Sequence, residues 1–455
     1  MGNTNTKPFG VKDKIGYMCG DIANDFTFIF ASSYVMVFYT KVMGVSAGMV
    51  GTMFLLARCL DAFTDIGMGR IVDNSKPTKN GRIRPWILRM CAFVALASFM
   101  MYQSFLVDAP YAAKVAYMFI TYILWGSIFY TSVNIPYGSM ASVISSEPKD
   151  RSSLSVFRSL GGTLAGILIG MLAPMVVYYT DEAGNKVVSA SKISMIAGIF
   201  SVLAVICYLL CYTYVPKPDV QKKTFGQTVS ALFSSRSLMG LILSAVLLLL
   251  ASLMSQGINQ YLFADYFKNT AALSVYSLLM LPCVLVLSAV STKLAVKYGK
   301  KECSLIGMFI SAGLYFIIGV LHVKNVWLFV GLAFLAMIGM YFFQMQCWAL
   351  VTDVIDDMEV KNHTRDDGTV YGMYSFARKI GQAIAGGLSG WALGWIGYDE
   401  LATSQTQEVA NGIYNLSTFF PAIIYALCGL ALLLIYPLSK AKVEANVKEL
   451  ESRRK

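Results

Sequence analysis

Two aspartates one helical turn apart are the residues of this sequence whose type and spacing point most directly to chemistry. Asp61 and Asp65 lie in the apolar stretch LARCLDAFTDIGMG, and their i, i+4 spacing places both carboxylates on one face of a helix. Two such anions repel each other in a low-dielectric environment. The repulsion is relieved if one takes up a proton or if a cation that prefers oxygen ligands binds between them. The alternative is a structural network in which Arg58 and Arg70 neutralise the pair.

A second acidic pair, Asp21 and Asp25, lies in the stretch GDIANDFTFIF. A carboxylate accepts hydrogen bonds from two adjacent sugar hydroxyls, so we expect Asp25 to face a substrate cavity. Aromatic rings can cover the apolar face of a pyranose, but we expect the aromatic residues of this stretch to pack toward lipid instead. These residues are Phe26, Phe28, Phe30, Tyr34 and Tyr39.

Near the other end of the chain, Lys379 precedes a run of glycines. We expect Lys379 to face the cavity, where it binds a substrate hydroxyl or responds to the cation site. Glycines at this spacing permit close helix approach, and we interpret them first as packing positions and second as a hinge. They are Gly381, Gly386, Gly387, Gly390 and Gly394.

Charged residues at the ends of the apolar stretches predict an ionic latch on the inner side of a membrane. Asp353 and Asp357 end one such stretch close to Arg365, and Arg70 and Asp73 end another. Their position at a boundary favours gating over substrate binding.

The elements that must position these residues are membrane-spanning helices. The chain has 455 residues, 56% hydrophobic and only 14% charged, with a mean hydropathy of +0.59. Soluble domains carry roughly 25% charged residues. A bilayer core about 30 Å thick needs roughly 17 to 25 apolar residues for each spanning helix. This composition excludes a soluble enzyme, a disordered chain and a nucleic-acid-binding domain.

Twelve runs of at least 15 residues contain no charge, and they predict an all-α integral membrane protein with 12 transmembrane helices. The runs are 26–40, 42–57, 90–107, 115–146, 159–180, 193–216, 237–264, 269–292, 303–323, 325–352, 380–398 and 409–439.

Lysine and arginine are retained in cytoplasmic loops, so their distribution predicts topology. With the amino terminus inside, inward segments hold 26 of them and outward segments hold six. Both termini are therefore predicted to be cytoplasmic. We expect the basic tail to be a solvated, partly helical end, with contact to anionic lipid as the alternative.

A polar stretch of about 20 residues that follows Pro216 and Pro218 divides the helices into two groups of six. The predicted organisation is an N-terminal bundle (1–215), a cytoplasmic linker (216–236), a C-terminal bundle (237–439) and a cytoplasmic tail (440–455). Short turns that pair a glycine with a basic residue follow the second and the eighth helix. They resemble the loop motif of the major facilitator superfamily, in which two halves surround a central cavity.

Longer stretches resemble the glycoside-pentoside-hexuronide:cation symporters, the melibiose permease-like family. They run in family order from the first helix to the eleventh. They are GDIANDF (20–26), GTMFLLARCLDAFTDIGMGRIVD (51–73), GRIRPWIL (81–88), TYILWG (121–126), NIPYGSM (134–140), VFRSLGG (156–162), TDVIDDME (352–359) and the segment 379–398.

The resemblance implies a cation site and a sugar site. The cation site comprises Asp61 and Asp65 as the metal-binding carboxylates, with Thr131 and Thr64. The sugar site comprises Asp25, Asn134, Arg158, Lys379 and Tyr137. Thr64 stands where the melibiose-transporting member has asparagine, so Na+ and H+ are both candidate ions and Li+ is a further one. Asn134 stands where that member has a second sugar-binding aspartate, which leaves the sugar open.

The predicted function is cation-coupled sugar uptake by alternating access at a bacterial inner membrane. The expected partners are a small sugar, a monovalent cation and the bilayer, with no nucleic acid. We expect a functional monomer without a cofactor and without enzyme activity. An uncoupled carrier of an amphipathic lipid and a nontransporting sugar sensor are the alternatives.

Overall fold

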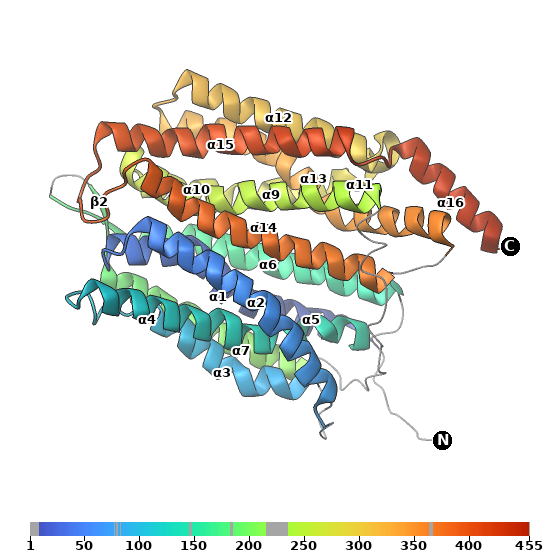
Figure 1. The fold of residues 1–455 in the computed structure, drawn as a ribbon, viewed down its shortest axis with the longest axis horizontal. Coiled ribbons are helices and arrows are strands. Elements are labelled where there is room, and N and C mark those ends of the chain that lie inside the picture. The colour runs from blue at the N-terminus through green and yellow to red at the C-terminus, as the bar shows by residue number, and fades with distance from the viewer. Residues whose placement is uncertain are drawn as a thin grey trace. The chain divides into compact units, whose positions relative to one another are not determined.

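The computed structural model describes residues 9–76, 78, 81, 83–144, 148–182, 185–214, 235–363 and 367–454. The chain divides into two compact units, Met1–Thr224 with Asp399–Thr403, and Phe225–Tyr398 with Ser404–Lys455. Figure 1 shows that each unit is built from long helices. The predicted linker 216–236 lies almost entirely outside the described residues.

The first unit contains six long helical segments among its described residues. In chain order they are α1 (Val11–Lys41), α2 (Ala47–Asn74), α3 (Arg84–Met100), the continuous run of α4 (Tyr111–Ile123), the π-helix η1 (Leu124–Tyr130) and α5 (Thr131–Ile144), then α6 (Pro148–Val177) and α7 (Ala190–Tyr214). The strands β1 (Tyr178–Thr180) and β2 (Lys186–Val188) pair antiparallel between α6 and α7. This hairpin is not predicted from the sequence, because strands of three residues are too short for a recognisable alternation.

The second unit also contains six long helical segments in its described part, followed by a polar terminal helix. They are α9 (Arg236–Tyr261) continued by the π-helix η2 (Leu262–Tyr266), α10 (Thr270–Leu278) followed by α11 (Met280–Tyr298), α12 (Lys300–Leu321), α13 (Val326–Asn362), α14 (Asp367–Trp395) and α15 (Gln407–Leu434). The terminal helix is α16 (Lys440–Arg454). The predicted tail is therefore helical over most of its length.

These helical segments follow the charge-free runs of the sequence and confirm the predicted all-α membrane fold. Ten of the segments in the described residues are long and apolar enough to cross a membrane by length and composition. The other two are α3, with 17 residues, and α14, which carries Arg378 and Lys379. Large apolar side chains such as Phe63, at 75% exposure, remain uncovered along the helices, as expected of a surface that faces lipid.

The aromatic residues of α1 form the core of the first unit, and the prediction that they face lipid is wrong. Phe26, Phe30, Tyr34 and Tyr39 are all buried. The Phe30 ring lies 5.0 Å from Tyr34, 4.9 Å from Tyr102 and 5.4 Å from Phe200 between ring centroids. Helix α1 packs against both α6 and α7, so little of its surface is left for lipid. Aromatic content does not distinguish a lipid-facing stretch from one covered by neighbouring helices.

Small residues let α12 and α13 approach closely in the second unit. A Cβ atom added to Gly307 would lie 2.9 Å from the Gly339 carbonyl oxygen, and Ser311 Oγ donates a 2.6 Å hydrogen bond to the Ala336 carbonyl. In α14, a Cβ added to Gly381 would meet the α9 backbone at Val246 at 3.3 Å. This contact agrees with a packing role for Gly381, whereas a Cβ added to Gly394 would meet nothing within 4 Å.

Candidate functional site

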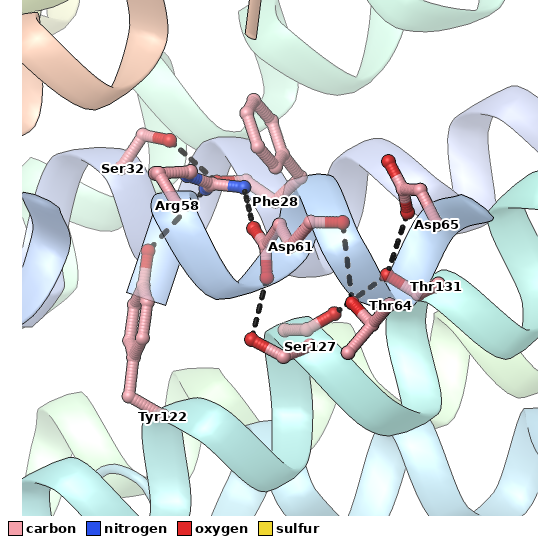
Figure 2. A network of polar contacts seen from close by, with 10 residues as sticks. Phe28, Ser32, Arg58, Asp61, Thr64, Asp65, Tyr122, Ser127 and Thr131 are labelled. Atoms are coloured by element: carbon pink, nitrogen blue, oxygen red, sulfur yellow. Dashed lines mark hydrogen bonds and ion pairs between the residues drawn. The ribbon is translucent and has the colours of Figure 1, made fainter. Parts of the chain in front are cut away.

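The acidic pair of α2 lies against the helix built from α4, η1 and α5. Asp61 is 6% exposed, and its Oδ1 accepts a 2.5 Å hydrogen bond from Ser127 Oγ. Asp65 Oδ1 accepts a 3.0 Å bond from Thr131 Oγ1. Figure 2 shows the two carboxylates in succession along α2, Asp65 to the right of Asp61, each bound to a hydroxyl of the neighbouring helix. The two acids therefore face a protein interior rather than lipid.

The π-helix η1 presents these two hydroxyls. Ser127 lies within η1, and Thr131 is the first residue after it, with its hydroxyl also 3.2 Å from the Gly126 carbonyl oxygen. Segments of π-helix frequently occur at functional sites. Thr131 belongs to the predicted cation site, whereas Ser127 does not, although the sequence contains a signal for it. Its signal is that Ser127 and Thr131 have the same i, i+4 spacing as the acidic pair that they contact.

Arg58 neutralises one member of the acidic pair. Its Nη1 lies 2.9 Å from Asp61 Oδ2, and its Nη2 donates a 3.3 Å hydrogen bond to Tyr122 Oη. This contact is half of the structural network considered as the alternative to a cation site. Arg70, the other arginine of that alternative, is exposed.

Thr64 does not donate to a carboxylate in this structure. Its Oγ1 donates a 3.2 Å hydrogen bond to the Asp61 backbone carbonyl, one turn earlier in α2 (Figure 2). A threonine hydroxyl within a helix commonly bonds its own backbone in this way.

A second polar cluster joins α1 and α6. Asp21 is 8% exposed, and its Oδ1 accepts a 2.9 Å charged hydrogen bond from Arg158 Nε. A Cβ atom built on Gly162 of α6 would lie 2.5 Å from Asp25 Oδ2 and 3.2 Å from Asp21 Oδ2. Both oxygens therefore approach the same point on the α6 backbone. Asp25 thus lies in a polar cluster, its role in a substrate cavity stays a prediction, and Asp21 is a member of this cluster that the predicted site omitted.

Tyr137 supports the arginine of this α1–α6 cluster. The Arg158 guanidinium lies 5.4 Å from the Tyr137 ring centroid, within the range of a cation–π contact. Tyr137 donates a 2.7 Å hydrogen bond to the Tyr17 carbonyl, and the two tyrosine rings stack with centroids 4.6 Å apart. Arg158 and Tyr137 therefore come together as predicted. Asn134, also on α5 and three residues before Tyr137, is half-buried.

Phe28 follows Asp25 by one turn of α1 and contacts the arginine that pairs with Asp61. The Arg58 guanidinium is 5.0 Å from the Phe28 ring centroid, and the Tyr130 ring stacks on Phe28 at 5.9 Å. Figure 2 shows Phe28 and Ser32 beside Arg58, with Ser32 Oγ donating a 2.9 Å bond to the Phe28 carbonyl. The two polar clusters are thus neighbours along α1.

In the second unit, Lys379 is half-buried on α14. Its neighbour Arg378 lies over two aromatic rings, 5.7 Å from the Trp348 centroid and 5.9 Å from the Tyr374 centroid. These contacts involve α13 and α14 only.

The acidic end of α13 binds partners within its own unit. Asp353 Oδ1 lies 2.6 Å from Lys300 Nζ of α12. Asp357 is fully buried, and accepts bonds from Lys361 Nζ at 2.6 Å, Ser237 Oγ at 2.8 Å and Asn446 Nδ2 at 3.2 Å. These contacts tie α13 to α9, α12 and α16.

Two other members of the predicted latch are not covered by this description. Arg365 lies outside the described residues, and so does the side chain of Asp73.

The donor set of the acidic pair suits a monovalent cation or a proton. Carboxylate and hydroxyl oxygens are hard ligands, which alkali ions accept and softer transition metals do not favour. Within the part of the chain that the structure describes, no group of three or more His, Cys, Asp or Glu side chains could hold a metal ion. The α1–α6 cluster offers carboxylates, a guanidinium and a tyrosine ring, which together are suited to hydroxyl-bearing solutes.

Comparisons with known proteins identify the family of this chain. Residues 16–440 match the family described as MFS/sugar transport protein. The chain is 30% identical to an uncharacterized symporter, YjmB, of Bacillus subtilis, over 98% of this chain and 96% of the relative. It is 29% identical to the glucuronide carrier protein homolog of Escherichia coli, over 97% and 95% of the two chains.

A solved structure establishes the fold. The inward-facing, occupied structure of a bacterial homolog of the human lysosomal transporter Spinster matches with a TM-score of 0.70 at 10% identity, over 95% of this chain and 97% of that one. The match confirms the predicted major facilitator fold.

Proposed function

The chain belongs to the MFS/sugar transport protein family, a family of transporters and not of enzymes, and we propose that it is a cation-coupled sugar symporter. The coupling ion is Na+ or H+, with Li+ as a further candidate, and the substrate is a glycoside, pentoside or hexuronide. The observation that carries the proposal is the acidic pair, with Asp61 buried and Asp65 half-buried, which faces two hydroxyls in the same unit as a carboxylate and arginine cluster.

The oxygen ligands of the acidic pair support a cation at Asp61 and Asp65. Each carboxylate lies within hydrogen-bond distance of a hydroxyl of the neighbouring helix, which supplies further hard oxygen atoms for an alkali ion. Asp65 and Thr131 are proposed as ligands of the ion, together with Asp61, which also pairs with Arg58. Thr64 becomes a ligand only if its hydroxyl turns away from the helix backbone.

The sugar is proposed to bind at the α1–α6 cluster. Asp25 accepts hydrogen bonds from sugar hydroxyls, and Arg158 donates hydrogen bonds to them. Tyr137 and Asn134 lie on α5, which contacts both α1 and α6. Lys379 on α14 is proposed as a further substrate-binding residue, which donates to a substrate hydroxyl.

Coupling follows from the neighbouring positions of the two polar clusters along α1. The cation lowers the negative charge of the acidic pair, the sugar binds, and the loaded transporter changes the side to which it is open. One charge that moves through about 100 mV gains roughly 2.3 kcal/mol. Because each 1.36 kcal/mol is a factor of about ten, one coupled cation sustains a sugar gradient on the order of fiftyfold.

The proposal also fixes an orientation and a setting. The distribution of basic residues favours cytoplasmic termini in a bacterial inner membrane. The transporter is proposed to work as a monomer, with the latch residues Arg70, Asp73, Asp353, Asp357 and Arg365 acting at its inner side.

Uptake of a panel of labelled sugars into proteoliposomes under an imposed Na+ or proton gradient tests this proposal. We expect Asp61→Cys to abolish accumulation against a gradient. The matched control is Asp108→Asn, which changes an exposed carboxylate in the connection between α3 and α4 and leaves accumulation intact. Normal accumulation by Asp61→Cys would overturn the cation-site assignment. Sugar flux without dependence on either ion would overturn symport.

A further inference from the structure

The contact between Asp21 and Arg158 has a consequence for the charge of the substrate. The Asp21 side chain is covered, at 12% exposure, whereas the Arg158 side chain is 39% exposed. The guanidinium is therefore the more accessible partner, and a solute that binds to it meets an arginine whose counter-charge is already in place. The 2.9 Å distance from Nε is that of a charge-assisted hydrogen bond.

Tyr137 fixes the other side of the arginine. The guanidinium lies over its ring, and the ring is held by its stacking on Tyr17 and by the hydrogen bond to the Tyr17 carbonyl. Gly20, next to Asp21 in α1, packs directly against the edge of the same ring, so the backbone that carries Asp21 is placed by Tyr137 as well. Arg158 is thus held between a carboxylate and a ring, both anchored on α1.

Two carboxyl groups lie at this position. Asp21 and Asp25 approach the same point on α6, and Asp21 pairs with Arg158. A carboxylate on the substrate would add a further negative charge to this surface, and like charges in a site of low dielectric constant repel strongly.

We propose that Asp21 is a specificity-determining residue that makes the sugar site prefer an uncharged glycoside or pentoside over a hexuronide. Asp21 acts through Arg158: it holds the guanidinium over Tyr137 for hydrogen bonds to sugar hydroxyls and balances the charge that would otherwise attract a substrate carboxylate. This inference rests on the proposed function, since it takes the α1–α6 cluster to be part of the sugar site.

Two pairs of ligands that differ only at carbon 6 test the assignment. Binding to the purified full-length protein is measured for p-nitrophenyl β-glucoside against the matching glucuronide, and for the galactoside against the matching galacturonide. The wild-type protein is expected to bind the uncharged member of a pair at least tenfold more tightly. A wild-type protein that binds a uronide as tightly as its uncharged partner overturns the proposal without any variant.

Substitutions then separate charge selectivity from a structural role. Asp21→Asn keeps the size of the side chain and removes its charge, so the preference for the uncharged sugar is expected to shrink about tenfold or more. Asp21→Glu restores the charge and is expected to keep the preference, even where both affinities fall. An equal loss of affinity for both members in Asp21→Asn would show that Asp21 is only structural and would overturn the inference.

Failure of the proposed function has a different signature. If neither pair binds to the wild-type protein and no sugar of the panel is taken up, the symporter assignment itself fails, and this inference falls with it.

Discussion

Gly162 offers the sharpest test of whether Asp25 belongs to the sugar site. An alanine Cβ at this position would lie 2.5 Å from Asp25 Oδ2 and 3.2 Å from Asp21 Oδ2. Contacts at that first distance are essentially never found in proteins, so the Asp25 carboxylate must move away from α6 by several tenths of an ångström or more. The substitution therefore displaces the carboxylate without changing its charge.

The expected loss follows from the hydrogen bonds that Asp25 makes to the sugar. A hydrogen bond to a charged group contributes about 1.5 to 3 kcal/mol, and the loss of one such bond weakens binding by about tenfold to a hundredfold. Stability moves in the other direction, because alanine is favoured over glycine within a helix by roughly 0.5 to 1 kcal/mol. Gly162→Ala is thus expected to lose sugar affinity while the protein stays folded.

Gly166→Ala is the matched control for this experiment. Gly166 lies one turn later on the same face of α6, and a Cβ there would meet only Ile29 Cδ1, at an ordinary contact distance of 3.5 Å. The control gains the same helix propensity and is expected to bind sugar like the wild-type protein. Sugar affinity is measured by calorimetry or by fluorescent ligand displacement, and thermal unfolding in detergent reports stability.

The outcomes distinguish an effect of the Asp25 carboxylate on sugar binding from an effect of α6 packing. Wild-type affinity in Gly162→Ala would refute the placement of Asp25 in the sugar site. An equal loss of affinity in both variants would show that α6 packing, and not the carboxylate, controls binding.

Three further substitutions test other parts of the structure. Ser127→Ala removes the 2.5 Å donor to Asp61 and should change the Na+ or proton dependence of sugar binding by about fivefold or more. The control Ser132→Ala removes a hydroxyl that bonds the Ile128 carbonyl of its own helix, and it should leave this dependence unchanged. Identical ion dependence in both variants would refute the cation-site geometry. Asp357→Ala leaves three donors, Lys361, Ser237 and Asn446, without this acceptor and should lower the free energy of unfolding by about 3 kcal/mol or more. A clear fall in melting temperature measures this loss, and Asp356→Ala, at a half-buried position, is the control that should show a smaller fall. Tyr414→Phe removes a hydroxyl that bonds the Val323 N–H and the Ile318 carbonyl at the carboxyl end of α12, at 2.8 Å each. The free energy of unfolding should fall by about 1 to 3 kcal/mol while sugar affinity stays unchanged. An unaltered melting temperature would contradict this structural role.

The sequence predicts the membrane fold well because the signal is local and repeated. A bilayer excludes charge over the length of each spanning helix, so every span leaves its own record in consecutive residues. The i, i+4 spacing of Asp61 and Asp65 is equally local, because helix geometry alone places both on one face. The resemblance to a symporter family adds the roles of Arg158 and Thr131, which spacing alone does not supply.

Errors and omissions arise where the partner of a side chain is distant in the sequence. The aromatic residues of α1 face the core and not lipid, because α6 and α7 cover them. Ser127 is absent from the predicted site because its partner Asp61 lies 66 residues away, and the i, i+4 spacing of Ser127 and Thr131 does not by itself identify that partner. Likewise, the pairing of Asp21 with Arg158 joins residues 137 positions apart.

By itself the sequence determined that this chain is a helical membrane protein and which carboxylates lie within its spans, because both properties depend on neighbouring residues and on the solvent. Only the tertiary structure decided which side chain each carboxylate meets. Arg58 forms an ion pair with Asp61, Thr131 donates a hydrogen bond to Asp65, and Arg158 forms an ion pair with Asp21. These pairings depend on how helices rotate and pack against one another. That arrangement is settled by the whole bundle at once, since each contact brings together residues that are far apart along the chain.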